Sequence, residues 1–333
     1  MMNVNRPHRA TVPAAVLCLM ALGLATGTAH AQYPDRPITI IVPYAQGGPT
    51  DMVARPIVKE MSRVLGQPVE LEFKGGQGAT LAPRELMREG GDGGYKLLLH
   101  NIGMASAPTL YRQLGFDPTR DYLPVGLIAD APMMLLARKD FPVAEPAGFL
   151  PYIKRNERSL AVAYGGPGGA GALCGLMLEA ALRVKLLWIP YTGTKPAIDD
   201  LARGRADLLC DQTTNAAKPL GAGAIKAYAL TSGKRLEAMP DIPTTAELGA
   251  PGVEIAVWHA LYAVRGTAPE VVDRLSAALQ QAVASPEFVA SMKSVGVIPA
   301  TQAQATPAAL RRHLASEIAR WRPLIQATGQ YAD

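Results

Sequence analysis

The sequence is poor in aromatic residues and cysteine, and it carries no strong excess of one charge. Phe, Trp and Tyr make up 6% of the 333 residues, and the formal net charge is +5. Because no basic stripe is interleaved with aromatic side chains, the sequence predicts no nucleic-acid partner. It also lacks a Ser/His/Asp motif, a His-Glu-x-x-His motif and clustered carboxylates at metal-ligand spacing. We therefore expect neither a metal nor a cofactor, and a protein that is not an enzyme.

The sequence contains one long apolar run, close to the N-terminus. Two arginines precede this run, which extends from residue 12 to residue 24, and the small-residue segment 28–31 follows it. This order is typical of a cleavable signal peptide, and the run is shorter than the roughly 20 residues that a transmembrane anchor needs. The sequence thus predicts a signal peptide over residues 1–31, cleavage near Ala31, and a periplasmic mature protein.

Only three cysteines are present, and one of them, Cys18, lies in the predicted signal peptide. Cys174 and Cys210 form an even pair in a compartment that permits disulfides, so a disulfide and two buried free thiols both remain open. Cys174 also follows a glycine-rich loop at a predicted helix start, where a thiol pKa can be lowered. A Cys174-dependent enzyme with His259 as the base is therefore an alternative hypothesis.

The mature sequence alternates short apolar runs, glycine-rich turns and amphipathic segments. This rhythm predicts an α/β protein in which mostly parallel sheets are flanked by helices. Pro56 interrupts the first helical pattern, which leaves open a kink or a later helix start. The predicted strands are 37–43, 69–73, 96–100, 133–137, 160–164, 186–189 and 206–210, and the predicted helices are 52–65, 81–88, 173–182, 196–201, 267–284 and 307–327.

Four loops follow predicted strands, at residues 45–51, 164–172, 190–196 and 211–215. Ligands of open α/β sheets collect at the carboxyl ends of strands, and glycines there let the backbone approach a ligand closely. A helix N-terminus behind such a loop can bind a carboxylate through its N–H groups. Ordinary turns with capping residues are the alternative interpretation of each loop.

Taken in order, these segments resemble the Bug-type (TctC-like) substrate-binding proteins of tripartite tricarboxylate transport systems. The resemblance covers nearly all of the mature chain, and the ordered combination of motifs is more specific than any one of them. The matching text is Tyr33-Pro34-x-Arg36-Pro37-Ile38, Val42-Pro43, Gly47-Gly48-x-Thr50-Asp51-x-x-Ala54-Arg55, Pro190-Tyr191-x-Gly193-x-x-Pro196-Ala197, Cys210-Asp211-Gln212-Thr213-Thr214-Asn215, Ala229-Leu230-Thr231-Ser232, Pro240-Asp241-Ile242-Pro243-Thr244 and Trp258-His259-Ala260-Leu261-Tyr262-Ala263.

The resemblance implies a two-lobed periplasmic-binding-protein type II fold with a ligand cleft between the lobes, which closes like a Venus flytrap. The implied first lobe comprises residues 32–131 plus 254–333, and the second lobe comprises residues 132–253. Carboxylate recognition is implied mainly through backbone N–H groups of the first glycine-rich loop and bridging waters. The implied ligand-binding residues are Ala45, Gln46, Gly47, Gly48, Thr50, Asp51, Asn101 and Gly103 in the first lobe, and Gly168, Gly169, Thr192, Gly193, Thr194 and Asp211 in the second.

The resemblance further implies capture of a small organic acid or amino acid for membrane transporter subunits, with a sensor kinase as the alternative partner, by a monomer. One departure from the family pattern concerns the segment 166–172, which holds only Gly, Pro and Ala where members often carry a Ser or Thr and a His. Lys195 stands where a small residue is common. We expect Lys195 to supply the missing positive charge at the cleft, although an exposed lysine near a helix start is a common feature in itself.

Overall fold

The computed structural model describes residues 1–2, 33–166, 169–329 and 331–332. The chain divides into two compact units, residues 1–35 and residues 36–333, and the second unit holds all the helices and strands described below. The predicted signal peptide, apart from its first two residues, lies outside the described residues. Within the described part of the chain, no helix is both long and apolar enough to cross a membrane.

The first group of strands begins with three short parallel strands, β1 (Ile38–Val42), β2 (Val69–Phe73) and β3 (Lys96–Asn101). β9 (Ala256–Val264) then runs antiparallel to β3. β1 is β-branched and almost entirely buried, which is the pattern of a strand covered on both faces. The covering helices include α2 (Pro49–Leu65), α3 (Leu81–Glu89), α4 (Gly103–Leu110), α9 (Pro269–Val283), α10 (Pro286–Ser294) and α11 (Pro307–Thr328).

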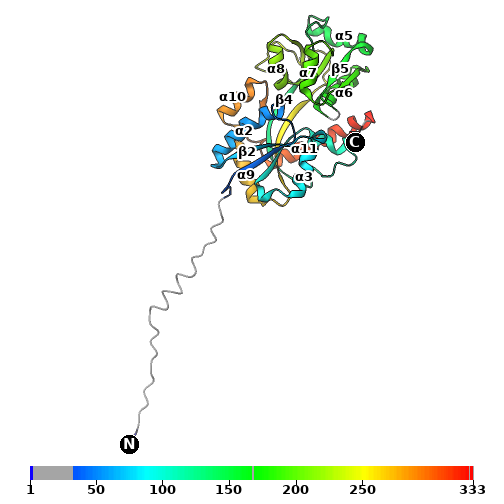
Figure 1. Cartoon of the computed structure of the whole chain (residues 1–333). Helices are drawn as coiled ribbons and strands as arrows, with labels where there is room; N and C mark the ends of the chain where they lie inside the picture. Colours follow the sequence, from blue (N-terminus) through cyan, green and yellow to red (C-terminus); the bar gives the residue numbers. More distant parts are fainter. Residues whose placement is uncertain (3–32, 167–168, 330, 333) are drawn as a thin grey trace. The chain divides into compact units, whose positions relative to one another are not determined.

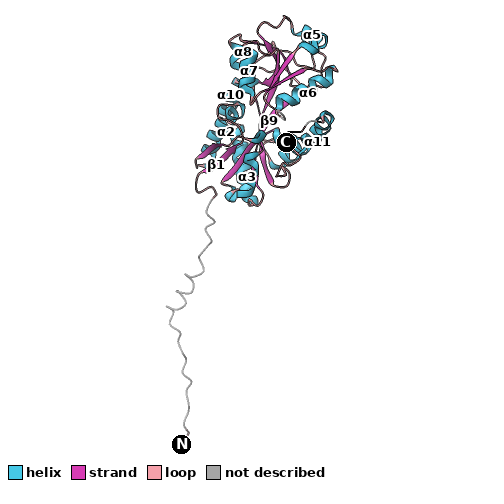
Figure 2. Cartoon of the chain, turned by 45° about the vertical axis from the view of Figure 1, so that its right-hand side comes forward, coloured by secondary structure: helices cyan, strands magenta, loops and turns pink. Residues whose placement is uncertain are grey.

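The second group repeats this arrangement with β5 (Ala161–Tyr164), β6 (Leu187–Pro190) and β7 (Leu208–Gln212), which are also parallel. Helices α6 (Ala170–Leu182) and α7 (Thr194–Ala202) connect these strands, and α8 (Thr213–Gly221) follows β7 directly. α5 (Phe149–Asn156) precedes β5, and β8 (Ile225–Leu230) completes the group. In Figure 1 the green helices α5 to α8 lie together, and Figure 2 shows strands at the centre of each group with helices around them.

One long strand, β4 (Tyr122–Arg138), belongs to both groups. Its first part, up to Pro132, pairs antiparallel with β9, whereas Met133 to Arg138 pair antiparallel with β7 and β8. Short β10 (Ile298–Pro299) also pairs with β4, so the described strands form one ten-stranded sheet. The predicted parallel arrangement therefore holds within β1–β3 and β5–β7, while the pairs made by β4 and β9 are antiparallel. Short 3-10 turns complete the elements of the described residues: η2 (Gln77–Ala79), η3 (Asp92–Gly94), η4 (Pro146–Gly148) and η5 (Glu157–Ser159).

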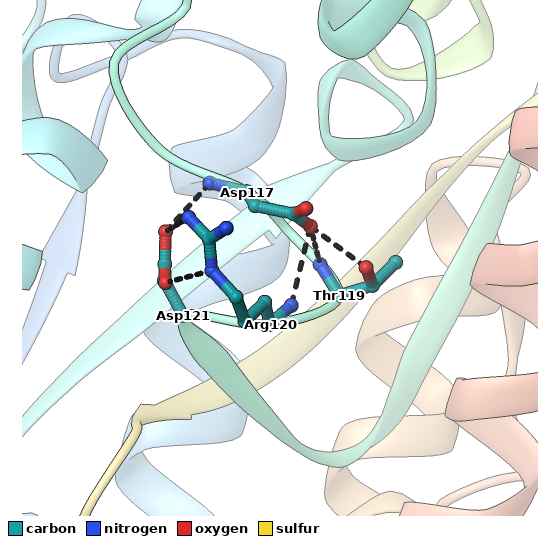
Figure 3. Close-up of polar contacts among 4 residues, drawn as sticks. All are labelled: Asp117, Thr119, Arg120 and Asp121. Atoms are coloured by element: carbon teal, nitrogen blue, oxygen red, sulfur yellow. Dashed lines mark hydrogen bonds and ion pairs between the residues drawn. The ribbon is translucent and has the colours of Figure 1, made fainter.

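The turn that leads into β4 is built by two aspartates and their local partners (Figure 3). The Asp117 carboxylate accepts hydrogen bonds from the amide of Thr119 at 2.8 Å and from its hydroxyl at 2.7 Å. The Asp121 carboxylate accepts the Asp117 amide at 2.7 Å and pairs with Arg120 Nε at 3.0 Å. Such side-chain to backbone bonds fix a turn locally, so β4 starts from a defined position.

Thr231 joins the strands at the point where the chain passes from one group to the other. Its buried hydroxyl donates to the Ile255 carbonyl at 2.6 Å, lies 3.0 Å from the Met133 carbonyl and accepts from the Met133 amide at 3.1 Å. The Ile255 amide donates to the Thr231 carbonyl at 3.0 Å. One side chain thus fixes the relative positions of three crossing segments.

Replacing Thr231 by valine should lower the free energy of unfolding by about 2 kcal/mol, because the isosteric side chain leaves buried backbone groups of Met133 and Ile255 with fewer partners. Thr231→Ser keeps the hydroxyl and is the matched control. Urea denaturation of both variants measures the effect. Equal stability of the valine and serine variants would show that the hydroxyl is not what joins these segments.

Each helix and strand that the sequence predicted coincides with an observed element of the same type. β2 has the predicted bounds, and the predicted segments 37–43, 307–327 and 81–88 are β1, α11 and α3 to within a few residues. The alternative of a later helix start after Pro56 is wrong, because α2 begins at Pro49 and continues through Pro56 to the left-handed Gly66 that ends it. The elements that the sequence did not predict are the first part of β4 and all of α4, α5, α8, α10, β8, β9 and β10.

Candidate functional site

Two clusters of polar side chains lie at the carboxyl ends of the parallel strands. The first cluster joins the loop after β1 to the loop after β3. Tyr44, which follows β1, donates its hydroxyl hydrogen to Asn101 Oδ1 at 2.6 Å, and the same oxygen accepts the Gly103 amide at 3.0 Å. Both acceptor positions of Oδ1 are used, so the Asn101 side chain is held in one orientation, with its Nδ2 as the remaining donor.

His100 fixes the position of the first cluster through its contacts with Ala79 and Asn101. The His100 ring is buried, and its Nε2 lies 3.2 Å from the Ala79 carbonyl oxygen. Its Nδ1 accepts a hydrogen bond from the Asn101 amide at 2.8 Å. This pattern requires the hydrogen on Nε2. Burial lowers the pKa of His100 to about 4, so the imidazole is neutral at physiological pH. His100 thus contributes position to Asn101 and no positive charge.

Thr50 and Asp51, at the start of α2, make contacts inside the protein. Thr50 Oγ1 lies 3.2 Å from Nε2 of His259, and both residues are buried. Burial lowers the pKa of His259 to about 3, so this histidine is also neutral. The buried Asp51 carboxylate forms an ion pair with Arg55 Nε at 2.8 Å. These two predicted ligand residues therefore organise the start of α2.

The expectation that the Gly47 and Gly48 amides are free to bind an anion is wrong for this structure. The Gly47 amide donates to Asp51 Oδ2 at 2.7 Å, and the Gly48 amide donates to the Ala45 carbonyl at 3.3 Å. The physical reason is local, because a carboxylate in the first turn of a helix satisfies the donors in front of it. Ala45, Gln46 and Gly47 remain exposed in this loop.

The second cluster joins the loops after β6 and β7. Asn215, in the first turn of α8, donates through Nδ2 to Thr194 Oγ1 at 2.9 Å and to Asp211 Oδ2 at 3.0 Å. Both Nδ2 hydrogens of Asn215 are used in these bonds, and Thr194 Oγ1 is an acceptor in one of them. The hydroxyl hydrogen of Thr194 itself has no hydrogen-bond partner among the described residues. Gly165, after β5, lies against Thr194, because an added Cβ would be 3.0 Å from the Thr194 amide nitrogen.

The remaining predicted second-lobe residues are distributed unevenly. Thr192 is exposed beside Gly193, which is the uncapped start of α7, and Gly169 is exposed at the uncapped start of α6. Gly168 lies outside the described residues. Asp211 is 1% exposed, and its Oδ1 accepts the Gln212 amide at 2.8 Å. Burial raises the pKa of Asp211 to about 6, against the smaller effects of its hydrogen bonds to Asn215 and Gln212.

Cys174 and Cys210 form a disulfide that links α6 to the middle of β7. The hypothesis of a Cys174-dependent enzyme is therefore wrong for this oxidised protein, because a disulfide sulfur is not a thiolate nucleophile. Its proposed base, His259, bonds Thr50 beside the other cluster. In the part of the chain that the structure describes, no group of three or more His, Cys, Asp or Glu side chains could hold a metal ion.

Lys195 is largely exposed and pairs with Asp199 one turn along α7, with Nζ 2.9 Å from Oδ2. This pairing does not support the expectation that Lys195 carries uncompensated charge toward a ligand. Exposed pairs of this kind contribute little to stability. The side chains that make up the two clusters are thus neutral or acidic.

Two surface hollows lie away from both clusters. One, of about 470 Å³, is lined by Gly233, Lys234, Arg235, Thr244, Ala246 and Glu247, and its Arg235 is paired with Glu247 at 3.0 Å. The other, of about 290 Å³, lies between α2 and α10. Neither hollow includes a predicted ligand residue.

Asp211 gives the protein a pH-dependent stability contribution with a defined sign. Its folded-state pKa of about 6 is above the usual value of about 4, so between these values the unfolded chain loses its proton first and rising pH favours unfolding. The cost is absent below pH 4 and complete above pH 6. Relative to the original protein, Asp211→Asn should gain about 3 kcal/mol across this window.

Chemical denaturation of both proteins from pH 4 to pH 7 measures this gain. A difference in unfolding free energy that is the same at every pH reflects the altered hydrogen bonds of the variant, not the titration of Asp211. Parallel stability curves for the two proteins would contradict a raised pKa at Asp211.

The sequence pattern gave no binding role to Tyr44 or His100, and it offered Asn215 only as part of the polar loop 211–215, although these three residues position Asn101 and Thr194. Their only signal was location. His100 is the last residue of a predicted strand, and Tyr44 and Asn215 lie within five residues after one.

Comparison with known proteins gives a consistent result. The family described as "Tripartite tricarboxylate transporter family receptor" (TctC) matches residues 53–330. A curated relative from Agrobacterium vitis, a UPF0065 protein, is 38% identical over 317 residues, which are 95% of this chain and 91% of that protein. The periplasmic binding protein BugD is 41% identical with a TM-score of 0.82, covering 90% of this chain and 99% of BugD. MatC from Rhodopseudomonas palustris, solved with bound malate, is 36% identical with a TM-score of 0.80, covering 88% of this chain and all of MatC.

Proposed function

Because this chain belongs to the TctC family of tripartite tricarboxylate transporter receptors, which are periplasmic solute-binding proteins, we propose that it captures a small dicarboxylate for a membrane transporter. MatC, at 36% identity, binds malate, which makes malate the first ligand to test. Export would use the N-terminal segment as a signal peptide cleaved near Ala31. The transporter is preferred to a sensor kinase as the partner because the matching family is named for the transporter.

The observation that carries the proposal is the fixed polarity of the two clusters. Tyr44 and Gly103 occupy the oxygen of Asn101, which leaves its Nδ2 as a donor. Asn215 occupies the Thr194 oxygen, which leaves that hydroxyl hydrogen as a donor. Donors held in place by the protein stabilise an anion without reorganisation when it arrives. Two such donors from different strand groups suit a ligand with an oxygen-rich group at each end.

The uncapped start of α7 adds to this donor set. Gly193 precedes α7 without a side-chain cap, so the first amides of α7 are not satisfied by a neighbouring side chain. Amides and the helix dipole at such a terminus favour a carboxylate. This source of positive potential replaces the role that the sequence assigned to Gly47, Gly48 and Lys195.

Closure of two lobes around the ligand completes the proposed mechanism. We place the lobes at residues 32–131 plus 254–333 and at 132–253, because the pairing of β4 changes between Pro132 and Met133. The Thr231 contacts with Met133 and Ile255 mark the same crossing. A ligand that contacts both clusters binds the closed form more tightly, which is the condition for shifting the equilibrium toward closure.

A thermal-stability screen of the mature protein against organic acids tests the proposal. Malate, succinate and longer dicarboxylates form the core of the panel, with a monocarboxylate and a neutral diol as controls. A ligand at 100 times its dissociation constant should stabilise the protein by about 2.7 kcal/mol. If no acid raises the melting temperature of a protein that is folded by circular dichroism, capture of a dicarboxylate is ruled out. Affinity capture of detergent-solubilised membranes with the liganded protein then distinguishes transporter subunits from a sensor kinase.

A further inference from the structure

We infer that the Cys174–Cys210 disulfide is a positioning element of the binding site, which holds the N-terminal half of α6 against the middle of β7 and thereby keeps the Thr194 donor in place. The inference rests on the proposed function and adds a dependence of ligand affinity on the oxidised state. Cys210 directly precedes Asp211, and Cys174 lies near the start of α6.

Three strand-end segments of the second group contact one another at this point. Asn215 ties the segment after β7 to Thr194, which opens α7 after β6. Gly165, after β5, lies directly against Thr194, with the site of an added Cβ 2.9 Å from Thr194 Cγ2. The contact of α6 with β7 is equally close, because an added Cβ on Gly171 would be 3.0 Å from the Cys210 carbonyl oxygen. The disulfide is the covalent member of this set of contacts.

The rest of α6 is held by contacts that do not involve the disulfide. Gly175 packs directly on the ring of Trp188, with no room for a side chain between them. Buried Glu179 accepts the Leu186 amide at 2.7 Å and the Trp188 indole N–H at 3.1 Å. Loss of the disulfide should therefore leave α6 folded and docked while its first turn and the adjoining segments become less ordered.

Because only the first turn of α6 depends on the disulfide, a positioning role can be distinguished from a general contribution to stability. If the disulfide only stabilised the second strand group, an equally destabilising substitution elsewhere in that group would change ligand affinity by the same amount. A bond that positions the Thr194 donor affects ligand affinity specifically, because ordering of the site must then be completed at the moment of binding.

The test compares the mature oxidised protein with its Cys174→Ala/Cys210→Ala variant and with Phe149→Leu. Phe149 stacks on Tyr228 at a centroid distance of 4.2 Å in a separate aromatic cluster of the same strand group, so its replacement destabilises without touching the binding loops. Malate titration by calorimetry should show about tenfold weaker binding for the cysteine variant and unchanged binding for Phe149→Leu. Reduction and alkylation of the original protein should reproduce the loss, and the same treatment should leave the cysteine variant unaffected.

Hydrogen exchange of the ligand-free proteins supplies a readout that does not depend on the ligand. Peptides covering the first turn of α6 and residues 191–196 should exchange several-fold faster without the disulfide, while peptides of β5 and β7 keep their protection. Equal malate affinity in the oxidised and cysteine-free proteins would overturn the inference, as would unchanged exchange at the start of α6 or an equal loss of affinity in Phe149→Leu. Failure of the untreated oxidised protein to bind any acid would instead count against the proposed function.

Discussion

Replacing Asn101 by leucine is expected to weaken malate binding by about 100-fold, equivalent to about 2.7 kcal/mol. Asn101 Oδ1 is the common acceptor for the Tyr44 hydroxyl and the Gly103 amide, and its Nδ2 is the proposed donor to the ligand. Leucine removes the donor and also leaves two partly buried groups without their partner, which disorders the loops after β1 and β3. Calorimetric titration of the folded variant measures the loss.

Two further variants separate these effects. Tyr44→Phe removes only the hydroxyl that orients Asn101, so it should reduce affinity by less, about tenfold. Asn101→Asp keeps the acceptor oxygen but replaces the donor with a negative charge, and should weaken binding at least as much as leucine. Wild-type affinity in both Asn101 variants would place the ligand elsewhere.

A second large effect is expected on stability, for Gly126→Ala in β4. An added Cβ would lie 2.5 Å from the carbonyl carbon and oxygen of Ala305, in the segment before α11. These are backbone atoms in a buried region, and Leu127 donates its amide to Gln304 at 3.3 Å in the same segment. Neither strand nor segment can yield without losing contacts, so the substitution should cost about 3 kcal/mol of unfolding free energy.

The matched control for this substitution is Gly252→Ala. No atom lies within 4 Å of the position of its added Cβ, and its backbone is outside the left-handed region. We expect a change of less than about 0.5 kcal/mol there. Urea denaturation of the two variants compares them directly. If Gly126→Ala were as stable as Gly252→Ala, the close approach of β4 and residue 305 would be wrong.

The local sequence pattern predicted the parallel part of the fold well, because most of these strands are short apolar runs followed by a glycine-rich or polar turn. It failed for the first part of β4, where Pro124, Gly126 and Pro132 are residues that normally argue against a central strand. β9 was also missed, because the polar His259 interrupts its apolar run. Both strands are stabilised by their long-range antiparallel pairing, which no local pattern reports.

The sequence predicted the location of the candidate site better than the roles of its residues. The loops after β1, β3, β6 and β7 each contribute to a polar cluster, as strand-end reasoning predicts. The roles within them depended on contacts that the sequence does not show. Asp51 satisfies the Gly47 amide, Asp199 pairs with Lys195, and Asn215 determines which atom of Thr194 is a donor. Each of these depends on side-chain geometry across a turn or between loops.

A crystal structure of the mature protein with malate, or with the strongest dicarboxylate of the screen, tests the account most directly. We predict one carboxylate within hydrogen-bonding distance, about 3 Å, of Asn101 Nδ2 and the other end of the ligand equally close to Thr194 Oγ1. A ligand bound in the hollow beside Arg235, or one that contacts a single cluster while the other faces solvent, would contradict it.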